Sequence, residues 1–273
     1  MDKIIVPIDF SEYSEYALET AAILAKRNNA EILALHMLEI ERGRVTDSNN
    51  EHNEKMVFFL KLAEQKFDEF LAKEFLDGVN VTPIVKHFKV FSEVAEVAED
   101  HSADMIVMGS HGASGLSEIF VGSNTEKVVR HSEIPVLVVK QKPSKLNFDT
   151  VTFASDFSTE MVEPYVKARQ LFNNLKLIHV NVPGEGFSSS MEMESKVADF
   201  LQKADGNLDK LNDVHYTSDY TVEKGILNAS NLLGADLIAV PTHGRKGLAH
   251  FFTGSVSEDV ANHASLPVIT FKI

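Results

Sequence analysis

The chain has 273 residues, no cysteine and a formal net charge of −14. The lack of cysteine excludes disulfides, thiolate metal sites and a cysteine nucleophile, and the negative charge argues against a nucleic-acid partner. No apolar stretch approaches the roughly 20 residues that span a bilayer, and the first residues lack the apolar stretch of a signal peptide. We therefore expect a cytoplasmic protein that binds neither membranes nor nucleic acid.

Short runs rich in Ile, Val and Leu alternate with amphipathic segments along the first half of the chain. The runs predict buried strands near residues 3–8, 31–38, 81–87, 104–109 and 135–140. Ser11 is a suitable N-cap for a first helix, and helical spacing predicts further helices over Asn53 to Phe75, around Val94 to Ala98, and from Ser123 to His131. Alternating strands and helices predict a parallel sheet with helices on both faces.

The second half of the chain repeats the first. VTFASDFSTEM from Val151 aligns with IIVPIDFSEYS from Ile4, which places Asp156 over Asp9, and ADLIAVPTHG from Ala235 aligns with ADMIVMGSHG from Ala103. Strands are expected again near residues 150–155, 175–181, 215–219, 236–240 and 267–272. Because the matched blocks keep their order, the sequence predicts two tandem domains, over residues 1–142 and 148–273.

Five strands of this kind are expected in the order 3-2-1-4-5, which makes strands 1 and 4 neighbours with diverging outgoing loops. Ligands bind in the crevice that such loops form beyond the carboxyl ends of the strands. Asp9 follows the first predicted strand, and the glycine-rich stretch from Gly109 to Val129 follows the fourth. The most unusual features of each half therefore meet at the expected binding edge.

The glycine-rich stretch has the composition of a phosphate cradle. Glycines let main-chain N–H groups approach a ligand, and a helix that starts at Gly122-Ser123 offers free N–H donors and a positive dipole end. The stretch contains neither the P-loop motif nor the dinucleotide fingerprint. The alternative is a glycine-rich turn before a capped helix, and two aligned copies, each beside an aspartate, favour the cradle.

The spacing Gly109-x₂-Gly112-x₉-Gly122-Ser123 resembles the nucleotide-binding motif of universal stress proteins. VPIDFS from Val6, LHM from Leu35 and IPVLVV from Ile134 are similar to that family as well, and the resemblance covers both halves. It implies two Rossmann-like domains of the adenine nucleotide alpha hydrolase type that bind ATP, with which Mg²⁺ can arrive.

The resemblance also implies the role of individual residues in the first half. Asp9, with Pro7 and Ile8 before it, would contact the adenosine part, and the main chain at Met37 would meet the adenine edge. The residues expected to line ribose and phosphates are Met108, Gly109, Ser110, His111, Gly112, Gly122, Ser123, Asn124 and Thr125.

The second half departs from this pattern, because Pro241 stands where the first half has Gly109 and proline has no N–H to donate. We expect a weaker, altered or empty second site; the alternative is that ATP never uses that donor. The candidate residues there are Asp156, Val180, Thr242, His243, Gly244, Gly254 and Ser255.

The remaining expectations concern metals, assembly and activity. His36 and His179 are interpreted as packed histidines, and no metal site is predicted. The fifth strand of each half is a bare edge that predicts an intramolecular pseudo-dimer, to which a homodimer can be added. With no recognisable general base, the sequence favours a nucleotide-responsive stress regulator with at most slow ATP hydrolysis or self-phosphorylation. The alternatives are a phosphate-transferring enzyme and a nucleotide-free scaffold that binds another small ligand.

Overall fold

A computed structural model describes the whole chain except residues 39–49, 88–92, 112–121, 144–146, 185–186 and 244–255. The contacts divide the chain into two compact units, Met1–Lys145 and Leu146–Ile273. Within the described residues, no helix is both long and apolar enough to cross a bilayer.

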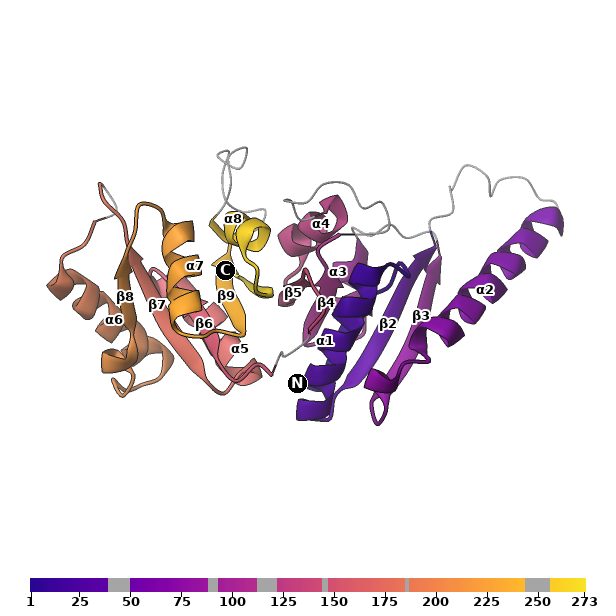
Figure 1. Ribbon diagram of the computed structural model, residues 1–273, viewed down its shortest axis with the longest axis horizontal. Coiled ribbons are helices and arrows are strands. Elements are labelled where there is room, and N and C mark those ends of the chain that lie inside the picture. Colours follow the sequence, from indigo (N-terminus) through magenta and orange to yellow (C-terminus); the bar gives the residue numbers. More distant parts are fainter. Residues whose placement is uncertain (39–49, 88–92, 112–121, 144–146, 185–186, 244–255) are drawn as a thin grey trace. The chain divides into compact units, whose positions relative to one another are not determined.

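The first unit is a five-stranded parallel sheet in the order β3-β2-β1-β4-β5 (Figure 1). Its strands are β1 (Lys3–Pro7), β2 (Glu31–Leu38), β3 (Asn80–His87), β4 (Met105–Gly109) and β5 (Val136–Val139). Its helices are α1 (Glu12–Asn28), α2 (Asn50–Leu71), α3 (Val94–Asp100) and α4 (Ser123–His131), with a 3₁₀ turn over Glu74–Leu76.

The second unit has the same topology, with the parallel order β8-β7-β6-β9-β10. Its strands are β6 (Val151–Ala154), β7 (Leu175–Asn181), β8 (His215–Ser218), β9 (Leu237–Thr242) and β10 (Val268–Lys272). Its helices are α5 (Val162–Leu171), α6 (Ser190–Ala204), α7 (Val222–Leu232) and α8 (Val256–His263), with 3₁₀ turns over Thr159–Met161 and Leu211–Asp213. The predicted α/β fold and the strand order 3-2-1-4-5 are confirmed in both units.

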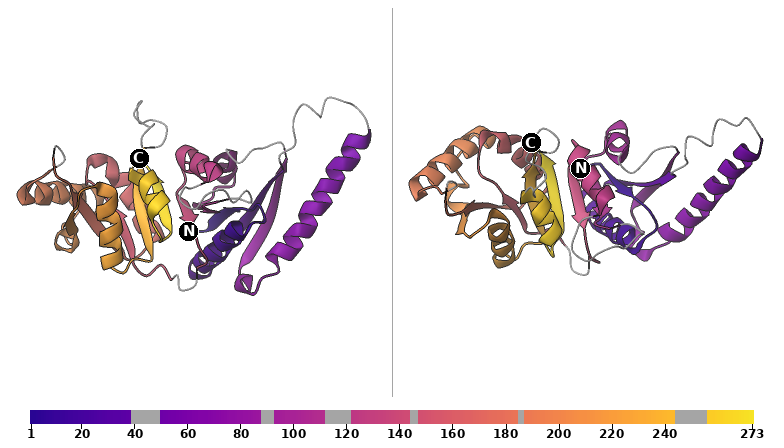
Figure 2. Two further views of the ribbon diagram at one scale, coloured as in Figure 1. Left: turned by 45° about the horizontal axis from the view of Figure 1, so that its top comes forward. Right: turned by 90° about the horizontal axis from the view of Figure 1, so that it is seen from above.

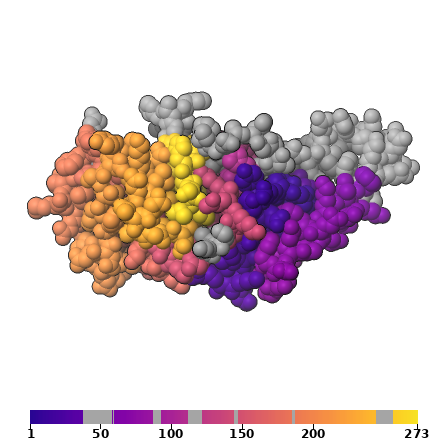
Figure 3. All heavy atoms as spheres, in the orientation of Figure 1, coloured from indigo at the N-terminus to yellow at the C-terminus, as the bar shows by residue number. Residues whose placement is uncertain are grey.

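Both faces of the first sheet are buried: successive side chains of each strand point to opposite faces, and helices cover both (Figure 2). Ile5, Leu35 and Ile106 pack with Val94 and Val97 of α3 in one apolar cluster, while α1 contacts β1, β2, β4 and β5. Helices of each unit lie on both faces of its sheet (Figure 2). In the second unit α7 and α8 lie side by side, as their orange and yellow surfaces in Figure 3 show.

Two helix boundaries differ from the predicted ones. The helix predicted over Asn53 to Phe75 begins at Asn50 and ends at Leu71. The chain is extended at Lys73, whose ammonium forms an ion pair with Glu15 of α1 (2.9 Å), and a 3₁₀ turn then buries Leu76. The apolar pattern therefore continues past Leu71 to Leu76, but these last residues form an extended segment and a 3₁₀ turn, not an α-helix.

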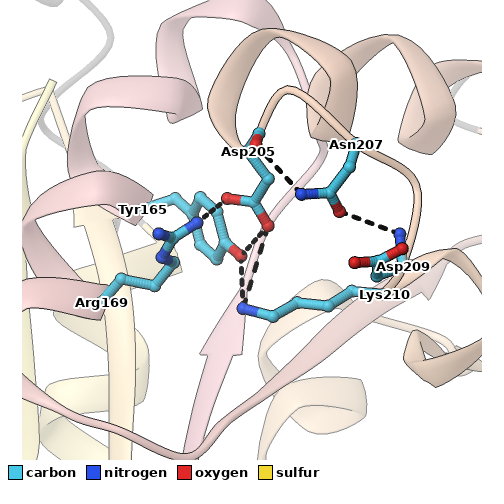
Figure 4. Close-up of polar contacts among 6 residues, drawn as sticks. All are labelled: Tyr165, Arg169, Asp205, Asn207, Asp209 and Lys210. Atoms are coloured by element: carbon cyan, nitrogen blue, oxygen red, sulfur yellow. Dashed lines mark hydrogen bonds and ion pairs between the residues drawn. The ribbon is translucent and has the colours of Figure 1, made fainter.

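A polar cluster joins α5 to the chain after α6 (Figure 4). The Tyr165 hydroxyl donates to Asp205 Oδ2 (2.9 Å) and accepts from Lys210 Nζ (2.8 Å), and Arg169 forms an ion pair with Asp205. Burial raises the pKa of Tyr165 above its ordinary value, so its hydroxyl stays a donor. Because α5 runs antiparallel to the strands, its last turn, with Arg169, lies toward their amino ends, away from the expected binding edge.

Candidate functional site

Asp9 lies just beyond the end of β1 and is tied to the start of α1. Its Oδ1 accepts hydrogen bonds from the Ser11 N–H (3.0 Å) and the Ser11 hydroxyl (2.5 Å). Ser11 is the N-cap of α1, as predicted, and its Oγ accepts from the Ser14 N–H (3.2 Å). The carboxylate is therefore held at the carboxyl edge of the sheet and remains partly exposed there.

The main chain of Met37 lies beyond the end of the neighbouring strand β1. The Ile8 N–H donates to the Leu35 carbonyl (2.7 Å), and Pro7 is the last residue of β1 in register with β2. Since main-chain groups of a strand alternate between its two sides, Met37 directs its N–H and C=O to the same side as Leu35. They are directed past the end of β1, at the edge of the sheet where a ligand is expected, while the Met37 side chain is buried in the core.

The start of α4 is fixed above the end of β4. The Gly122 N–H donates to the Ser110 carbonyl (2.6 Å), and the Thr125 hydroxyl donates to the Gly109 carbonyl (2.8 Å). Among the described residues, no side chain caps the start of α4. Ser123 and Asn124 are exposed in its first turn. This helix start therefore presents N–H groups and polar side chains to an incoming anion.

Gly109 is required for a packing reason that the sequence pattern does not show. A Cβ added to Gly109 would lie 2.7 Å from the Tyr13 carbonyl oxygen and 2.8 Å from the Tyr13 carbonyl carbon. The first turn of α1 thus packs directly on the end of β4. This close approach brings the start of α1, with its Asp9–Ser11 turn, next to Gly109 at the end of β4.

Several predicted residues use their polar groups within the protein. The Ser110 side chain is buried and hydrogen-bonds with His111 Nδ1 (2.9 Å), while its N–H donates to the Val139 carbonyl (2.8 Å). The His111 ring lies 5.2 Å from the Tyr13 ring, centroid to centroid. Ile8 and Met108 are buried and can form only the floor of the site. Gly112 lies outside the described residues.

His36 and His179 are packed histidines, in agreement with their interpretation from the sequence. His36 Nδ1 donates to the Ile8 carbonyl (2.7 Å) and His179 Nδ1 to the Ser155 carbonyl (3.2 Å). Burial lowers the pKa of both rings, so both stay neutral at neutral pH. Within the described part of the chain, no group of three or more His, Asp or Glu side chains is arranged to hold a metal.

The second unit places its candidate residues around a cavity of about 330 Å³. Asp156, Val180, Thr242 and His243 line it, with Asp156 Oδ1 accepting from the Ser158 N–H (2.8 Å), as Asp9 does from Ser11. Gly244, Gly254 and Ser255 lie outside the described residues. The two units thus share the aspartate turn but differ in neighbouring residues, such as Pro241 in place of Gly109.

The model of the universal stress protein family matches residues 1–140 and, separately, residues 148–272. The chain belongs to the universal stress protein family. It carries the family domain twice in tandem.

Several members of the family match about half of this universal stress protein over nearly their whole length. A universal stress protein of Methanocaldococcus jannaschii is 34% identical over 160 residues, covering 52% of this chain and 96% of that protein. One from Bacillus subtilis is 29% identical over 153 residues, covering 51% of this chain and 99% of its own length. The crystal structure of a universal stress protein from Archaeoglobus fulgidus covers 99% of this chain and 96% of its own, with a TM-score of 0.66 and 24% identity, and so supports the fold.

Sequence reasoning missed one residue at the site of this universal stress protein. Phe10, directly after Asp9, has a left-handed backbone with a φ of 63°, and its equivalent Phe157 has a φ of 58°. A bulky residue adopts this conformation only when its surroundings enforce it. The Phe10 ring contacts His36 and Phe67 of α2, at centroid distances of 4.7 and 5.4 Å. The repeated Asp-Phe-Ser triplet is the sequence signal that could have revealed it.

Proposed function

We propose that this universal stress protein binds ATP through its first unit and acts as a nucleotide-responsive stress regulator without fast catalysis. The observation that carries the proposal is that two kinds of polar groups lie at the carboxyl edge of one sheet, where the topology predicts a binding crevice. The main chain of Met37 is directed past the end of β1, which Asp9 follows, and the start of α4, which no described side chain caps, lies above the neighbouring strand β4.

The two ends of the crevice suit the two ends of ATP. A main-chain edge with both a donor and an acceptor matches an adenine base, and a carboxylate accepts from ribose hydroxyls but repels phosphate. The exposed first turn of α4, with Ser123 and Asn124, offers N–H donors and a positive dipole end to the phosphates. We therefore orient the nucleoside toward Asp9 and the phosphates toward α4, where Mg²⁺ can accompany them.

The proposed orientation also implies that any ATP hydrolysis or self-phosphorylation is slow. Asp9 Oδ1 accepts two hydrogen bonds from Ser11, and the proposed orientation places this carboxylate at the nucleoside end, away from the γ-phosphate. A general base has to lie within hydrogen-bond reach of the proton that it takes. We expect ATP to act on this protein by occupancy, with hydrolysis or self-phosphorylation slow.

The second unit is proposed to bind ATP weakly or not at all. Pro241 has no N–H, and Val256 stands in the first turn of α8 where the first unit has Asn124. We further propose that β5 and β10, the last strands of their sheets, associate to form an intramolecular pseudo-dimer in the cytoplasm, with a homodimer as the next level of assembly.

Titration calorimetry with Mg-ATP tests the proposed function. We expect one site per chain, lost or weakened at least about tenfold in Asn124→Asp, because a carboxylate at the start of α4 opposes the phosphates. Val256→Asp is the matched control, since it places the same charge in the first turn of α8, where Val256 is 42% exposed. Unchanged affinity in Asn124→Asp, or loss only in Val256→Asp, would contradict the proposal.

A further inference from the structure

The cavity of the second unit is apolar to a degree that a phosphate site does not require. Its volume of about 330 Å³ falls in the range of small-molecule pockets. Six aliphatic side chains from four elements line the cavity: Ile178 and Val180 of β7, Val222 and Ile226 of α7, Val240 of β9 and Val256 of α8. Such a wall gains free energy by covering apolar ligand surface and offers nothing to a polyanion.

Three substitutions between the aligned units make this difference. Pro241, Val256 and Met161 line the cavity where the first unit has, in aligned positions, Gly109, Asn124 and Ser14. Each change replaces a small or polar residue by an apolar one. They fall on β9, on the start of α8 and on the turn before α5, so three positions of the described lining have become apolar, while Thr242, His243 and Ser257 beside them stay polar.

The cavity wall is fixed by close packing. A Cβ added to Gly225 of α7 would lie 2.3 Å from Val180 Cγ1, so α7 rests directly on β7 at the cavity. A wall held this tightly is already formed before any ligand arrives.

The polar residues that line the cavity are Ser155, Asp156, Thr242, His243 and Ser257. Asp156 is exposed, with Lys196 3.9 Å away, and His243 lies 3.4 Å from Glu160. Inside, the hydroxyl-bearing residues Thr242 and Ser257 are buried. The Asp156 carboxylate accepts hydrogen bonds, which favours a ligand with a donor group, and the apolar wall disfavours a ligand with a negative charge.

We propose that the second unit is a binding site for an uncharged, mainly apolar small molecule that carries one hydrogen-bond donor, and that it rejects phosphate-bearing ligands. The apolar body fills the space between β7, α7 and α8, and the donor faces Asp156. The site is distinct from the ATP site proposed in the first unit and stands or falls independently of it.

A pair of dyes with one skeleton tests the proposal on the full chain. N-phenyl-1-naphthylamine is neutral with an N–H donor, and 8-anilino-1-naphthalenesulfonate adds a sulfonate to the same skeleton. The chain contains no tryptophan, so Lys224→Trp, on exposed α7 surface beside the cavity, introduces a single indole donor for energy transfer to bound dye. We expect the neutral dye to bind with energy transfer and its sulfonate to bind at least about tenfold more weakly.

Variants that fill the cavity complete the test. Val222→Trp and Met161→Trp place an indole in the cavity from α7 and from the 3₁₀ turn over Thr159–Met161, and each should weaken the neutral dye at least about tenfold relative to Lys224→Trp. Excess Mg-ATP should leave the neutral dye bound. The proposal is overturned if the neutral dye does not bind, if the two dyes bind equally, if ATP displaces the dye, or if both filled variants bind it as Lys224→Trp does.

Discussion

Replacing Gly109 by alanine tests whether close packing of α1 on β4 builds the first-unit site. The new Cβ would approach three Tyr13 atoms, including main-chain oxygen and carbon, to 2.7–2.8 Å, whereas ordinary contacts begin at 3.4 Å. Main-chain atoms cannot rotate away, so α1 or the end of β4 has to move. Overpacking of this kind costs about 1–3 kcal/mol, and the main-chain contact places Gly109→Ala in the upper half of that range.

For a unit of this size, a loss of about 2–3 kcal/mol lowers the midpoint of its thermal transition by about 5–10 °C. Differential scanning calorimetry measures this shift, and the first-unit transition is the one that Mg-ATP raises. Because the displaced turn of α1 carries Asp9 and Ser11, ATP affinity should also fall at least about tenfold.

Gly78→Ala provides the control for Gly109→Ala in the same unit. Gly78 has a φ of +77°, and nothing lies within 4 Å of its added Cβ, so alanine there strains the backbone without touching the site. It should lower the first-unit transition and leave ATP affinity unchanged. A Gly109→Ala protein with wild-type melting temperature and ATP affinity would refute the packing argument.

Three further predictions concern single side chains. Asp9→Asn keeps an acceptor for Ser11 and should leave the urea stability of the first unit near wild type, whereas Asp9→Ala should lose about 1 kcal/mol; equal losses would show that the hydrogen bonds from Ser11 to Asp9 do not stabilise the unit. Burial lowers the pKa of His36 in the folded state, so its stabilisation is complete above its unfolded pKa of about 6.5 and is lost as the pH falls below it. His36→Phe should therefore flatten the acid limb of first-unit stability, and an unaltered limb would count against this. Asp205→Ala should destabilise only the second unit, by about 2–3 kcal/mol, because it removes the partner of buried Tyr165; a change in first-unit ATP affinity would show that this cluster acts beyond its unit.

The strands and the start of the first helix could be predicted from the sequence because they depend on local patterns. The strand order then followed from the rules for alternating strands and helices. Buried runs of branched residues mark strands, and Ser11 marks a helix start whatever surrounds it. Ser123 to His131 was likewise predicted with both of its observed ends. Alternation of strand and helix then left one topology to expect.

What the sequence could not predict depends on contacts between distant segments. The left-handed backbone of Phe10 requires α2 to cover its ring, and the need for glycine at Gly109 arises from Tyr13, far away in the chain. Ser110 has the right residue type for a ligand contact, yet its groups are used by His111 and Val139. Side-chain direction and hydrogen-bond saturation are properties of the packed state, which residue spacing does not specify.

The central claim is that the first unit binds ATP between the main chain of Met37 and the start of α4. A crystal structure of the full chain grown with Mg-ATP measures this directly. The account predicts adenine against the Met37 main chain, ribose beside Asp9 and phosphates on the N–H groups of Ser123 to Thr125. Nucleotide found in the second-unit cavity alone, or a first-unit crevice left without nucleotide at saturating ATP, would contradict it.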